Sequence, residues 1–422
     1  MNIAILGCGT VGAGVIRLLR ANGCEIEKRL GEPLVLRYVL ARHPERAMEL
    51  GVPAEQITRE LSPILADPEV DTVVELIGGV EDANRYIRAA LSAGKHVVTA
   101  NKDVIALYLN ELSGLAEANG VTLSFEGSVG GGIPLIAPLR QTLAANRIRS
   151  IYGILNGTTN YILSRMCGEG MSFDEALSAA QGLGYAEADP SADVRGADAA
   201  RKIAILASLA FRSRVTFPQV RYEGITKITP ADIRFAERSG FAPKLLAVTR
   251  EKDEGIEVFV RPALVPKTHP LSAVAGAFNA VYLLGDPVGE VMLYGQGAGA
   301  DPTASSVVGD IMEAAHRRSG KGENICYDGR PVLDPGESEN VYYLSLLVDD
   351  RPKVLAGVAG ALGDCGISIA SLVQEPREDG AAELMLLTHR TLEKNLERAE
   401  ALLLGCDYVQ DLHTMICLED ER

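Results

Sequence analysis

The hydrophobic pattern of the first 126 residues alternates between short apolar runs and segments with helical spacing. The apolar runs, each short enough for one buried strand, are 3–6, 34–40, 72–76, 96–99 and 121–125. Helical spacing follows the first and third of these runs, over 11–19 and 82–93. Apolar strands separated by helices are typical of a parallel, doubly wound α/β sheet. Such sheets bind their ligands at the carboxyl ends of the strands.

The pattern is less regular from about residue 130 to residue 300. Ser172 and Glu175 form a capping-box pattern before a helix that we expect to end near Gly182. An apolar segment from Asp193 to Phe211 predicts one buried helix. Strand-like runs lie at 245–248 and 258–260. These elements indicate a mixed α+β substrate domain, whose topology the pattern leaves open.

The C-terminal part has its own order of elements. Strand, helix, strand, strand, helix and strand are predicted over 341–348, 354–362, 367–373, 384–388, 392–404 and 409–417. This βαββαβ order is typical of a ferredoxin-like module. Upstream, Asp301 and Pro302 have the pattern of an N-cap followed by proline at the first helical position, in a helix running to about Arg318. The polar residues 319–339, rich in Gly and Pro, are the best linker candidate.

Composition narrows the class of protein. A chain of 422 residues with 47% apolar and 23% charged residues is globular and suggests two or three domains. Its net charge of −15 argues against nucleic acid as a partner. Since no apolar run reaches about eighteen residues and the start lacks a signal-peptide pattern, we expect no membrane partner and a cytoplasmic location. Seven scattered cysteines without metal-ligand spacing indicate reduced thiols.

A glycine motif opens the chain. Gly7, Gly9 and Gly12 form a G-x-G-x-x-G pattern between the first apolar run and the first helix. In a dinucleotide-binding fold, these glycines permit a tight turn, close approach of the pyrophosphate and close helix–strand packing, respectively. The helix N-terminus then faces the negative charge. We predict a nicotinamide dinucleotide site here; the alternative is a glycine turn without a ligand.

Two cationic residues follow strand ends of this sheet. Arg42 comes after the second apolar run, where an NAD enzyme would carry Asp or Glu. Arginine there pairs with a 2′-phosphate and favours NADP over NAD, unless it is a solvated surface charge. Lys102 follows the strand 96–99, at the ligand-binding edge of the sheet, where a lysine can order a substrate carboxylate or the nicotinamide region. The alternative is an ordinary surface lysine.

Two further segments carry candidate chemistry. Asp198 and Lys202 are four residues apart and share one helix face. Burial would lower the pKa of Lys202 for proton transfer while Asp198 holds it, whereas the alternative is an exposed salt bridge. Around Glu126, small residues bring carbonyls together with a carboxylate, as in a hard-cation site. The residues alone favour a flexible domain crossover there.

Several segments together resemble homoserine dehydrogenase with a C-terminal ACT domain, over nearly all 422 residues. The most specific are 155–163, 184–190 with the residues that follow to Lys202, and 294–299 with 302–305. The resemblance implies reversible reduction of L-aspartate 4-semialdehyde to L-homoserine with NADPH or NADH, in threonine, methionine and isoleucine biosynthesis. It also implies a homodimer or homotetramer.

The same resemblance implies roles for single residues. Lys202 is the acid/base for the carbonyl oxygen, Asp198 and Glu187 bind the amino acid, and Lys102 lies between substrate and nicotinamide. Gly157 and Thr158 line the substrate pocket. Glu126 and the carbonyls of Val129, Gly131 and Ile133 match a monovalent cation site, usually sodium, against our interpretation from the residues alone. Cofactor contacts match Thr10, Val11, Gly184 and Gly299.

The implied domains are a dinucleotide-binding domain over 1–130, to which helix 302–318 returns, and a catalytic and dimerisation domain over 131–300. A linker over 319–339 and an ACT regulatory domain over 340–422 follow. ACT domains bind amino-acid effectors, and threonine would be the expected inhibitor. The family pattern has glycine where Lys353 stands, which speaks against an effector at this position. A module that only pairs subunits is the alternative.

Two other activities fit parts of the sequence. A semialdehyde dehydrogenase that works through a thiohemiacetal needs an activated cysteine, and Cys167, the only cysteine of the central domain, has no adjacent histidine. A non-catalytic NADP sensor would need no combination of Glu187, Asp198 and Lys202.

Overall fold

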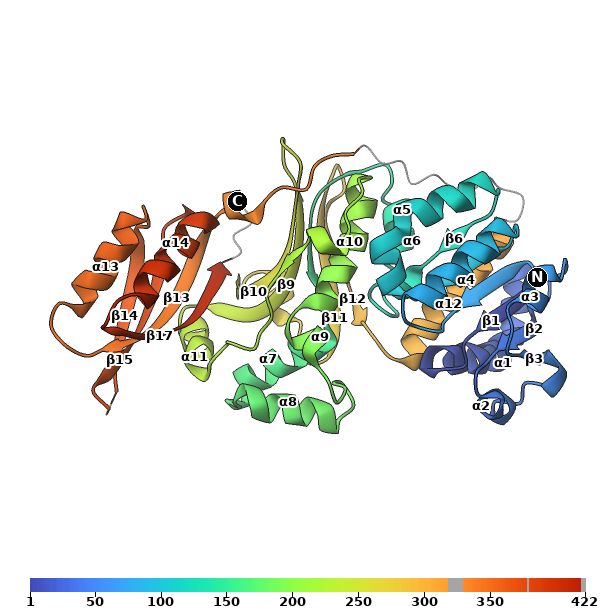
Figure 1. The fold of residues 1–422 in the computed structure, drawn as a ribbon, viewed down its shortest axis with the longest axis horizontal. Helices are drawn as coiled ribbons and strands as arrows, with labels where there is room; N and C mark the ends of the chain where they lie inside the picture. The colour runs from blue at the N-terminus through green and yellow to red at the C-terminus, as the bar shows by residue number, and fades with distance from the viewer. Residues whose placement is uncertain (318–328, 378, 419–422) are drawn as a thin grey trace. The chain divides into compact units, whose positions relative to one another are not determined.

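The chain folds into two compact units. The computed structural model describes residues 1–317, 329–377 and 379–418, with the elements labelled in Figure 1. Unit 1 comprises Met1–Ile151, Arg201–Val220 and Asn279–Arg330. Unit 2 comprises Tyr152–Ala200, Arg221–Phe278 and Pro331–Arg422.

Unit 1 contains a six-stranded parallel sheet in the order β3-β2-β1-β4-β5-β6. Its strands are β1 (Asn2–Leu6), β2 (Val35–Leu40), β3 (Ile57–Thr58), β4 (Thr72–Glu75), β5 (His96–Thr99) and β6 (Leu123–Ser124). The order changes direction between β1 and β4, where Rossmann-type sheets bind dinucleotides. The predicted doubly wound fold is therefore confirmed. Sequence reasoning missed β3, because a strand of two residues has no periodicity to read.

The helices of unit 1 flank this sheet. They are α1 (Thr10–Leu30), α2 (Pro44–Glu49), α3 (Ser62–Ala66), α4 (Glu81–Ser92), α5 (Lys102–Ala118), α6 (Ile136–Arg140) and α12 (Ala300–His316). Unit 1 also has the short helices η1 (Ala54–Gln56), η2 (Glu126–Ser128) and η3 (Phe217–Gln219) and most of the strands β11 (Phe278–Asp286) and β12 (Gly289–Gln296). Strand β7 (Arg147–Ile154) crosses the unit boundary after Ile151. Helix α12 crosses α1 closely, since a Cβ on Gly14 would lie 2.9 Å from the carbonyl oxygen of Ala300. Val307 and Ile311 of α12 join the core of the β1 region.

The start of α12 differs from the prediction. Its N-cap is Gly299, with φ 120°, and Asp301 lies within the first turn. The Asp301 carboxylate pairs with Arg17 at 3.3 Å instead of capping the helix. Pro302 is tolerated in the first turn because N–H groups there have no intrahelical acceptor.

Unit 2 contains a mixed sheet in which the C-terminal module continues a long hairpin. Strands β9 (Phe241–Glu251) and β10 (Ile256–Pro266) are antiparallel, and β17 (Val409–Leu418) runs parallel to β10 at Ala263 and Leu264. The order continues through β13 (Glu339–Asp349), β15 (Ala381–Thr388) and β14 (Ile369–Pro376). Short strands are β8 (Arg221–Tyr222) and β16 (Thr391–Leu392). With α13 (Val354–Asp364) and α14 (Glu393–Leu404), the predicted βαββαβ module is confirmed.

The remaining helices of unit 2 are α7 (Gly157–Glu169), α8 (Phe173–Gly182), α9 (Ser191–Val194) and α11 (Pro230–Arg238), with the short η4 (Pro270–Ala273) and η5 (Pro335–Glu337). The capping box of Ser172 and Glu175 is confirmed, and α8 ends at Gly182 as expected. The single helix expected over 193–211 is wrong. The chain breaks between α9 and α10 (Ala197–Phe211), because Gly196 adopts φ 89°, a left-handed conformation that ends a helix. The boundary between the two units falls within α10, after Ala200.

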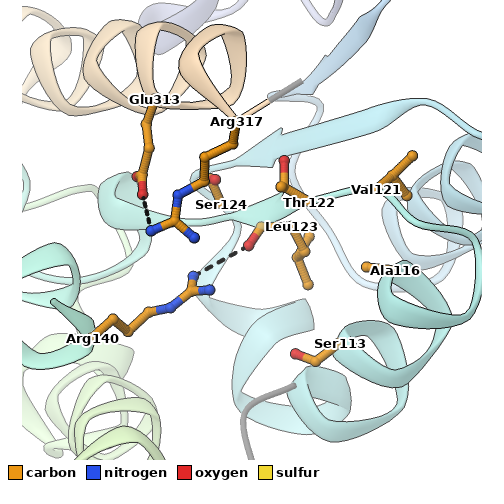
Figure 2. Close-up of a pocket in the computed structure, with 9 residues that line it drawn as sticks. All are labelled: Ser113, Ala116, Val121, Thr122, Leu123, Ser124, Arg140, Glu313 and Arg317. Atoms are coloured by element: carbon orange, nitrogen blue, oxygen red, sulfur yellow. Dashed lines mark hydrogen bonds and ion pairs between the residues drawn. The ribbon is translucent and has the colours of Figure 1, made fainter. Parts of the chain in front are cut away.

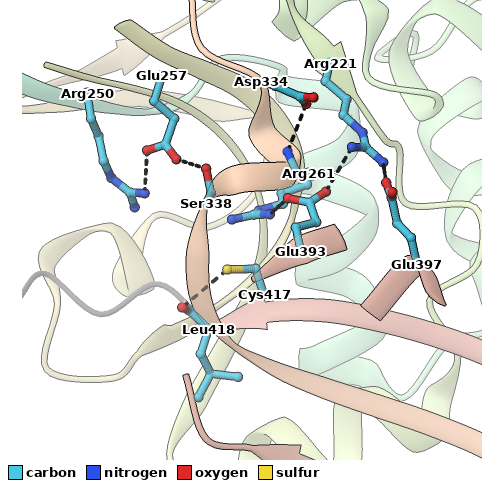
Figure 3. Close-up of polar contacts among 11 residues, drawn as sticks. Arg221, Arg250, Glu257, Arg261, Asp334, Ser338, Glu393, Glu397, Cys417 and Leu418 are labelled. Carbon is cyan, nitrogen blue, oxygen red and sulfur yellow. Dashed lines mark hydrogen bonds and ion pairs between the residues drawn. The ribbon is translucent and has the colours of Figure 1, made fainter. Parts of the chain in front are cut away.

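Polar contacts hold the C-terminal module against β10 (Figure 3). Arg261 of β10 contacts the carboxylate of Glu393 of α14 at 2.9 Å, with side chains 10% and 16% exposed. Residues 319–328 of the predicted linker lie outside the described residues. Farther along, the Ile256 N–H donates to the Pro331 carbonyl at 2.7 Å, and the Leu333 N–H donates to the Ile256 carbonyl at 2.7 Å. This part of the segment is therefore tied to the start of β10.

Candidate active site

The glycine turn after β1 has the geometry that a dinucleotide requires. Gly7 has φ 103°, and a Cβ there would lie 2.6 Å from the carbonyl oxygen of Leu76. A Cβ on Gly12 would lie 2.1 Å from the carbonyl oxygen of Gly7, so only glycine allows this helix–turn packing. By contrast, a Cβ on Gly9 would meet no atom within 4 Å. The open side of Gly9 is where a pyrophosphate would approach the start of α1.

A cavity of about 340 Å³ opens beside this turn in unit 1. Its lining includes Gly7 and Gly9 together with Arg42, Arg46 and Arg59. The structure thus brings Arg42 to the cavity, where its guanidinium lies 3.6 Å from the carboxylate of Asp82 with its side chain 83% exposed. Sequence reasoning missed Arg46 and Arg59, since α2 and the segment after β3 approach the turn only in the folded sheet. These residues fit the adenosine end of a dinucleotide.

Lys102 and Lys202 both belong to unit 1. Lys102 is the first residue of α5, whose N-cap Asn101 accepts from the Val104 N–H at 3.2 Å. Lys202 is buried, at 8% exposure, in α10. Their sequence neighbours meet directly, because Arg201 contacts the carboxylate of Asp103 at 2.7 Å. The ion pair joins the α10 turn that carries Lys202 to the start of α5, at the carboxyl end of β5.

In unit 2, one amide joins two acidic side chains. The Nδ2 of Asn156 donates to Asp193 at 2.7 Å and to Asp198 at 2.9 Å. Asp198 is 6% exposed and lies one turn before Lys202 in α10. Asp193 and Asn156 were assigned no role from the sequence, because α9 and the N-terminus of α7 meet only through the fold.

The other residues expected in the substrate pocket lie in the same unit. Gly157 and Thr158 open α7, and the Thr158 hydroxyl donates to the Tyr185 carbonyl at 2.6 Å. Glu187 is exposed on the loop after α8, and its carbonyl accepts from Gln181 at 3.2 Å. Gly184 has φ 77° on this loop. Thr10 and Val11 begin α1, and Gly299 caps α12, in unit 1.

The segment expected to hold a cation surrounds a buried carboxylate. Both Glu126 oxygens accept backbone N–H groups, of Leu135 and Ile136 at Oε1 (2.5 and 2.8 Å) and of Ala137 at Oε2 (2.7 Å). Burial raises the pKa of the Glu126 carboxyl, and these N–H groups oppose the rise. The Glu126 N–H donates to the buried Asp310 carboxylate at 2.8 Å.

One of the expected carbonyls already has a hydrogen-bond donor. The Gly131 carbonyl accepts the Ser306 hydroxyl at 2.6 Å. Figure 2 shows the nearby pocket, where Glu313 contacts Arg317 at 3.0 Å and Arg140 points at the carbonyl of Leu123. In the described part of the chain, no three His, Cys, Asp or Glu side chains gather as a metal site. A cation here would therefore depend on one carboxylate and main-chain carbonyls, a donor set that suits a hard ion.

The cysteines bear on the rival activities. The six described cysteines are free thiols. Burial raises the pKa of Cys167 to about 11, so its thiol is protonated at neutral pH and is a poor nucleophile. Among the described residues, no helix is both long and apolar enough to cross a membrane.

Comparison with known proteins covers the whole chain. Family models match for homoserine dehydrogenase (residues 134–312), its NAD-binding domain (7–126) and the ACT domain (342–405). The homoserine dehydrogenase of Corynebacterium glutamicum is 43% identical over 99% of this chain and 96% of its own length. A crystal structure of the Thiobacillus denitrificans enzyme matches with TM-score 0.92 and 42% identity, over 100% of this chain and 98% of that one. A hyperthermophilic archaeal homoserine dehydrogenase in complex with NADPH matches with TM-score 0.65 and 28% identity, over 76% and 99%.

The Rossmann-type unit with its open glycine turn and the matching family models show that the chain is a nicotinamide-dependent oxidoreductase. The C-terminal ferredoxin-like module is an ACT domain, a type that commonly binds amino-acid effectors. The chain belongs to the homoserine dehydrogenase family, whose members interconvert aspartate 4-semialdehyde and homoserine.

Proposed function

We propose that Lys202 is the acid/base of the homoserine dehydrogenase reaction in this chain. The observation that carries the proposal is the arrangement on α10, where Asp198, held by Asn156, lies one turn before a buried lysine. When bound, the nicotinamide supplies or accepts the hydride. The Lys202 ammonium stabilises the negative charge that develops on the substrate oxygen and donates its proton to that atom. In the oxidation of homoserine, the neutral amine takes this proton back.

The acidic residues bind the amino-acid end of the substrate in this proposal. Asp198 and Glu187 attract the α-ammonium group, and Gly157 and Thr158 line the pocket. Lys102 lies between substrate and nicotinamide and attracts the substrate carboxylate. The contact of Arg201 with Asp103 at 2.7 Å supports a site that includes both lysines, because it joins their two helices.

NADP is the proposed coenzyme, and NAD is the alternative. Support comes from the cavity beside the glycine turn, which three arginines line, Arg42, Arg46 and Arg59. A 2′-phosphate there would gain charge-assisted hydrogen bonds that NAD cannot make. The similar archaeal enzyme solved with NADPH adds support.

A monovalent cation, sodium, is proposed at Glu126 and the carbonyls of Val129, Gly131 and Ile133. Two buried carboxylates lie near each other, because the Glu126 N–H donates to the Asp310 carboxylate at 2.8 Å, and burial together with the Glu126 charge raises the pKa of Asp310. This negative charge supports a bound cation. Melting in NaCl against choline chloride tests this at equal ionic strength, with a higher melting temperature expected in NaCl. Equal melting temperatures would contradict it.

The proposal extends to regulation by the ACT domain and to assembly of subunits. The ACT domain takes an amino acid such as threonine, or it only pairs subunits. A cavity of about 160 Å³ at the start of α13 supports an effector site, whereas Lys353, which lines this cavity at φ 78°, stands where the family pattern has glycine and supports the alternative. Exposed Leu284, Val288 and Tyr294 on the β11–β12 hairpin support a homodimer or homotetramer, which light scattering would measure. The proposed domains are 1–130 with helix 302–318, 131–300, the linker 319–339 and 340–422. Free thiols support a cytoplasmic location.

Lys202→Met tests the acid/base. We expect kcat for NADPH-dependent reduction of aspartate semialdehyde to fall by about 100-fold or more, with the NADPH dissociation constant unchanged. Lys28→Met, an exposed lysine on α1, is the matched control. Turnover of Lys202→Met equal to that of the control would remove Lys202 from the mechanism. Wild-type protein that binds NADPH without turnover would favour the sensor.

The arginine cavity is tested with both coenzymes side by side. Because each charged hydrogen bond contributes about 1.5–3 kcal/mol, Arg59→Ala should lower kcat/KM with NADPH by about 10- to 100-fold. With NADH, kcat/KM should change little. An equal loss with both coenzymes would show that Arg59 has no role in reading the 2′-phosphate.

A further inference from the structure

Asn156 uses both ends of its side-chain amide. Its Oδ1 accepts the Thr159 N–H at 2.9 Å and the Thr159 hydroxyl at 3.0 Å, which caps the N-terminus of α7. An amide nitrogen could not accept these donors, so the orientation of the amide is determined. The Nδ2 is thereby directed at Asp193 and Asp198.

The amide donates to both carboxylates at once, and the Thr158 hydroxyl adds a longer contact to Asp193 at 3.4 Å. Asp193 and Asp198 both lie within 2.9 Å of one nitrogen atom, so their negative charges are close and repel each other. Both Asn156 and Asp198 are buried, at 5% and 6% exposure, where repulsion is weakly screened. Each hydrogen of the amide is directed at one carboxylate and helps to orient it. The α7 cap and the orientation of the acids are consequently one arrangement.

We infer that Asn156 is a positioning residue that orients Asp198 and Asp193 toward the α-ammonium group of the amino-acid substrate. This inference rests on the proposed role of Asp198 in binding that group. Without the amide, the carboxylates turn apart and the substrate ammonium must reorient them on binding. The expected defect therefore lies in binding of the amino acid and leaves binding of the coenzyme intact.

Asn156→Ser separates positioning from capping. Serine is also a good N-cap, but its side chain is too short to reach both acids. We expect KM for homoserine to rise by about 10-fold or more, KM for NADP⁺ to stay within about twofold, and the melting temperature to change little. If the serine variant folds poorly, Asn156→Thr replaces it in the same assays, because threonine is also a good N-cap residue. The matched control is Asn160→Ser, one turn along α7, whose amide donates to the carbonyls of Val274, Gly276 and Phe278.

A double-mutant cycle with Asp198→Asn supplies the decisive comparison. If Asn156 acts through Asp198, Asn156→Ser should lower kcat/KM for homoserine much less in the Asp198→Asn background than in the wild type. Equal losses in both backgrounds, or an equal rise in KM for Asn160→Ser, would overturn the inference. If Asp198→Asn loses activity and Asn156→Ser does not, only the positioning role fails. If Asp198→Asn itself keeps wild-type activity, the proposed function of Asp198 fails.

Discussion

Asp232 links helix α11 to strands β13 and β17 of the ACT domain by hydrogen bonds, and its replacement should destabilise this contact. One carboxylate oxygen accepts the Thr229 N–H at 2.7 Å and the Thr229 hydroxyl at 2.8 Å, which completes the α11 capping box. The other accepts the Tyr343 hydroxyl of β13 at 2.9 Å and the Thr414 hydroxyl of β17 at 2.8 Å. At 1% exposure, no solvent replaces these contacts.

The cost of Asp232→Ala follows from the groups left without an acceptor. The buried hydroxyls of Tyr343 and Thr414 each lose a charge-assisted bond, at about 1–3 kcal/mol per unsatisfied group. Loss of the capping box adds about 1 kcal/mol. We therefore expect Asp232→Ala to lower the free energy of unfolding by roughly 3–7 kcal/mol. Burial and the Asp232 charge hold the pKa of Tyr343 far above its usual range, so its hydroxyl stays a donor at any physiological pH.

Hydrogen exchange of the β13 and β17 amides, with calorimetric melting, measures this effect. Glu175→Ala is the matched control, because Glu175 forms the same capping box on α8 at an exposed position and contacts no ACT strand. We expect the control to cost about 1 kcal/mol. Equal effects of the two substitutions, or unchanged exchange in β13 and β17 of Asp232→Ala, would refute the reasoning.

Three further predictions concern the glycine turn after β1, the Cys167 thiol and the buried Lys244. Gly12→Ala should weaken NADPH binding by about 10-fold or more and lower the melting temperature, because its Cβ would lie 2.1 Å from the carbonyl oxygen of Gly7. Gly23→Ala is the control, since its Cβ would lie in open space on α1, and it should be neutral or stabilising. Fluorescence titration with NADPH and thermal melting measure the two effects. Cys167→Ser should keep full turnover in the NADPH-dependent reduction of aspartate semialdehyde, because the Cys167 thiol is protonated at neutral pH. Loss of turnover in this variant would favour the semialdehyde dehydrogenase that works through a thiohemiacetal. Burial lowers the pKa of Lys244 to about 8, so between pH 8 and 9 the unfolded chain binds more protons and stability should rise by up to about 1 kcal/mol; above pH 9 the raised pKa of Cys167 opposes this rise. Urea unfolding of Lys244→Met should lack the rise, and a rise of the same size would contradict the assignment.

Most elements of this fold could be predicted because their signals are local. Apolar runs and helical spacing predicted five strands of the first sheet and the βαββαβ order of the ACT domain. The glycine motif was readable because a tight turn, a close approach and a helix start lie within six residues, Gly7 to Gly12. Where local cues compete, prediction failed, as at Gly196, where one left-handed glycine divides an apolar segment into two helices.

By itself, then, the sequence determined the classes of its domains, the dinucleotide turn and, through family resemblance, the candidate lysines and acids. Only the tertiary structure decided which distant side chains share a site. Arg46 and Arg59 reach the cavity beside the glycine turn, and Asn156 meets Asp193 and Asp198, through contacts between segments far apart in the chain. The physical reason is that periodicity and turn chemistry act over a few residues, whereas hydrogen bonds and ion pairs between elements depend on packing that no short stretch of sequence encodes.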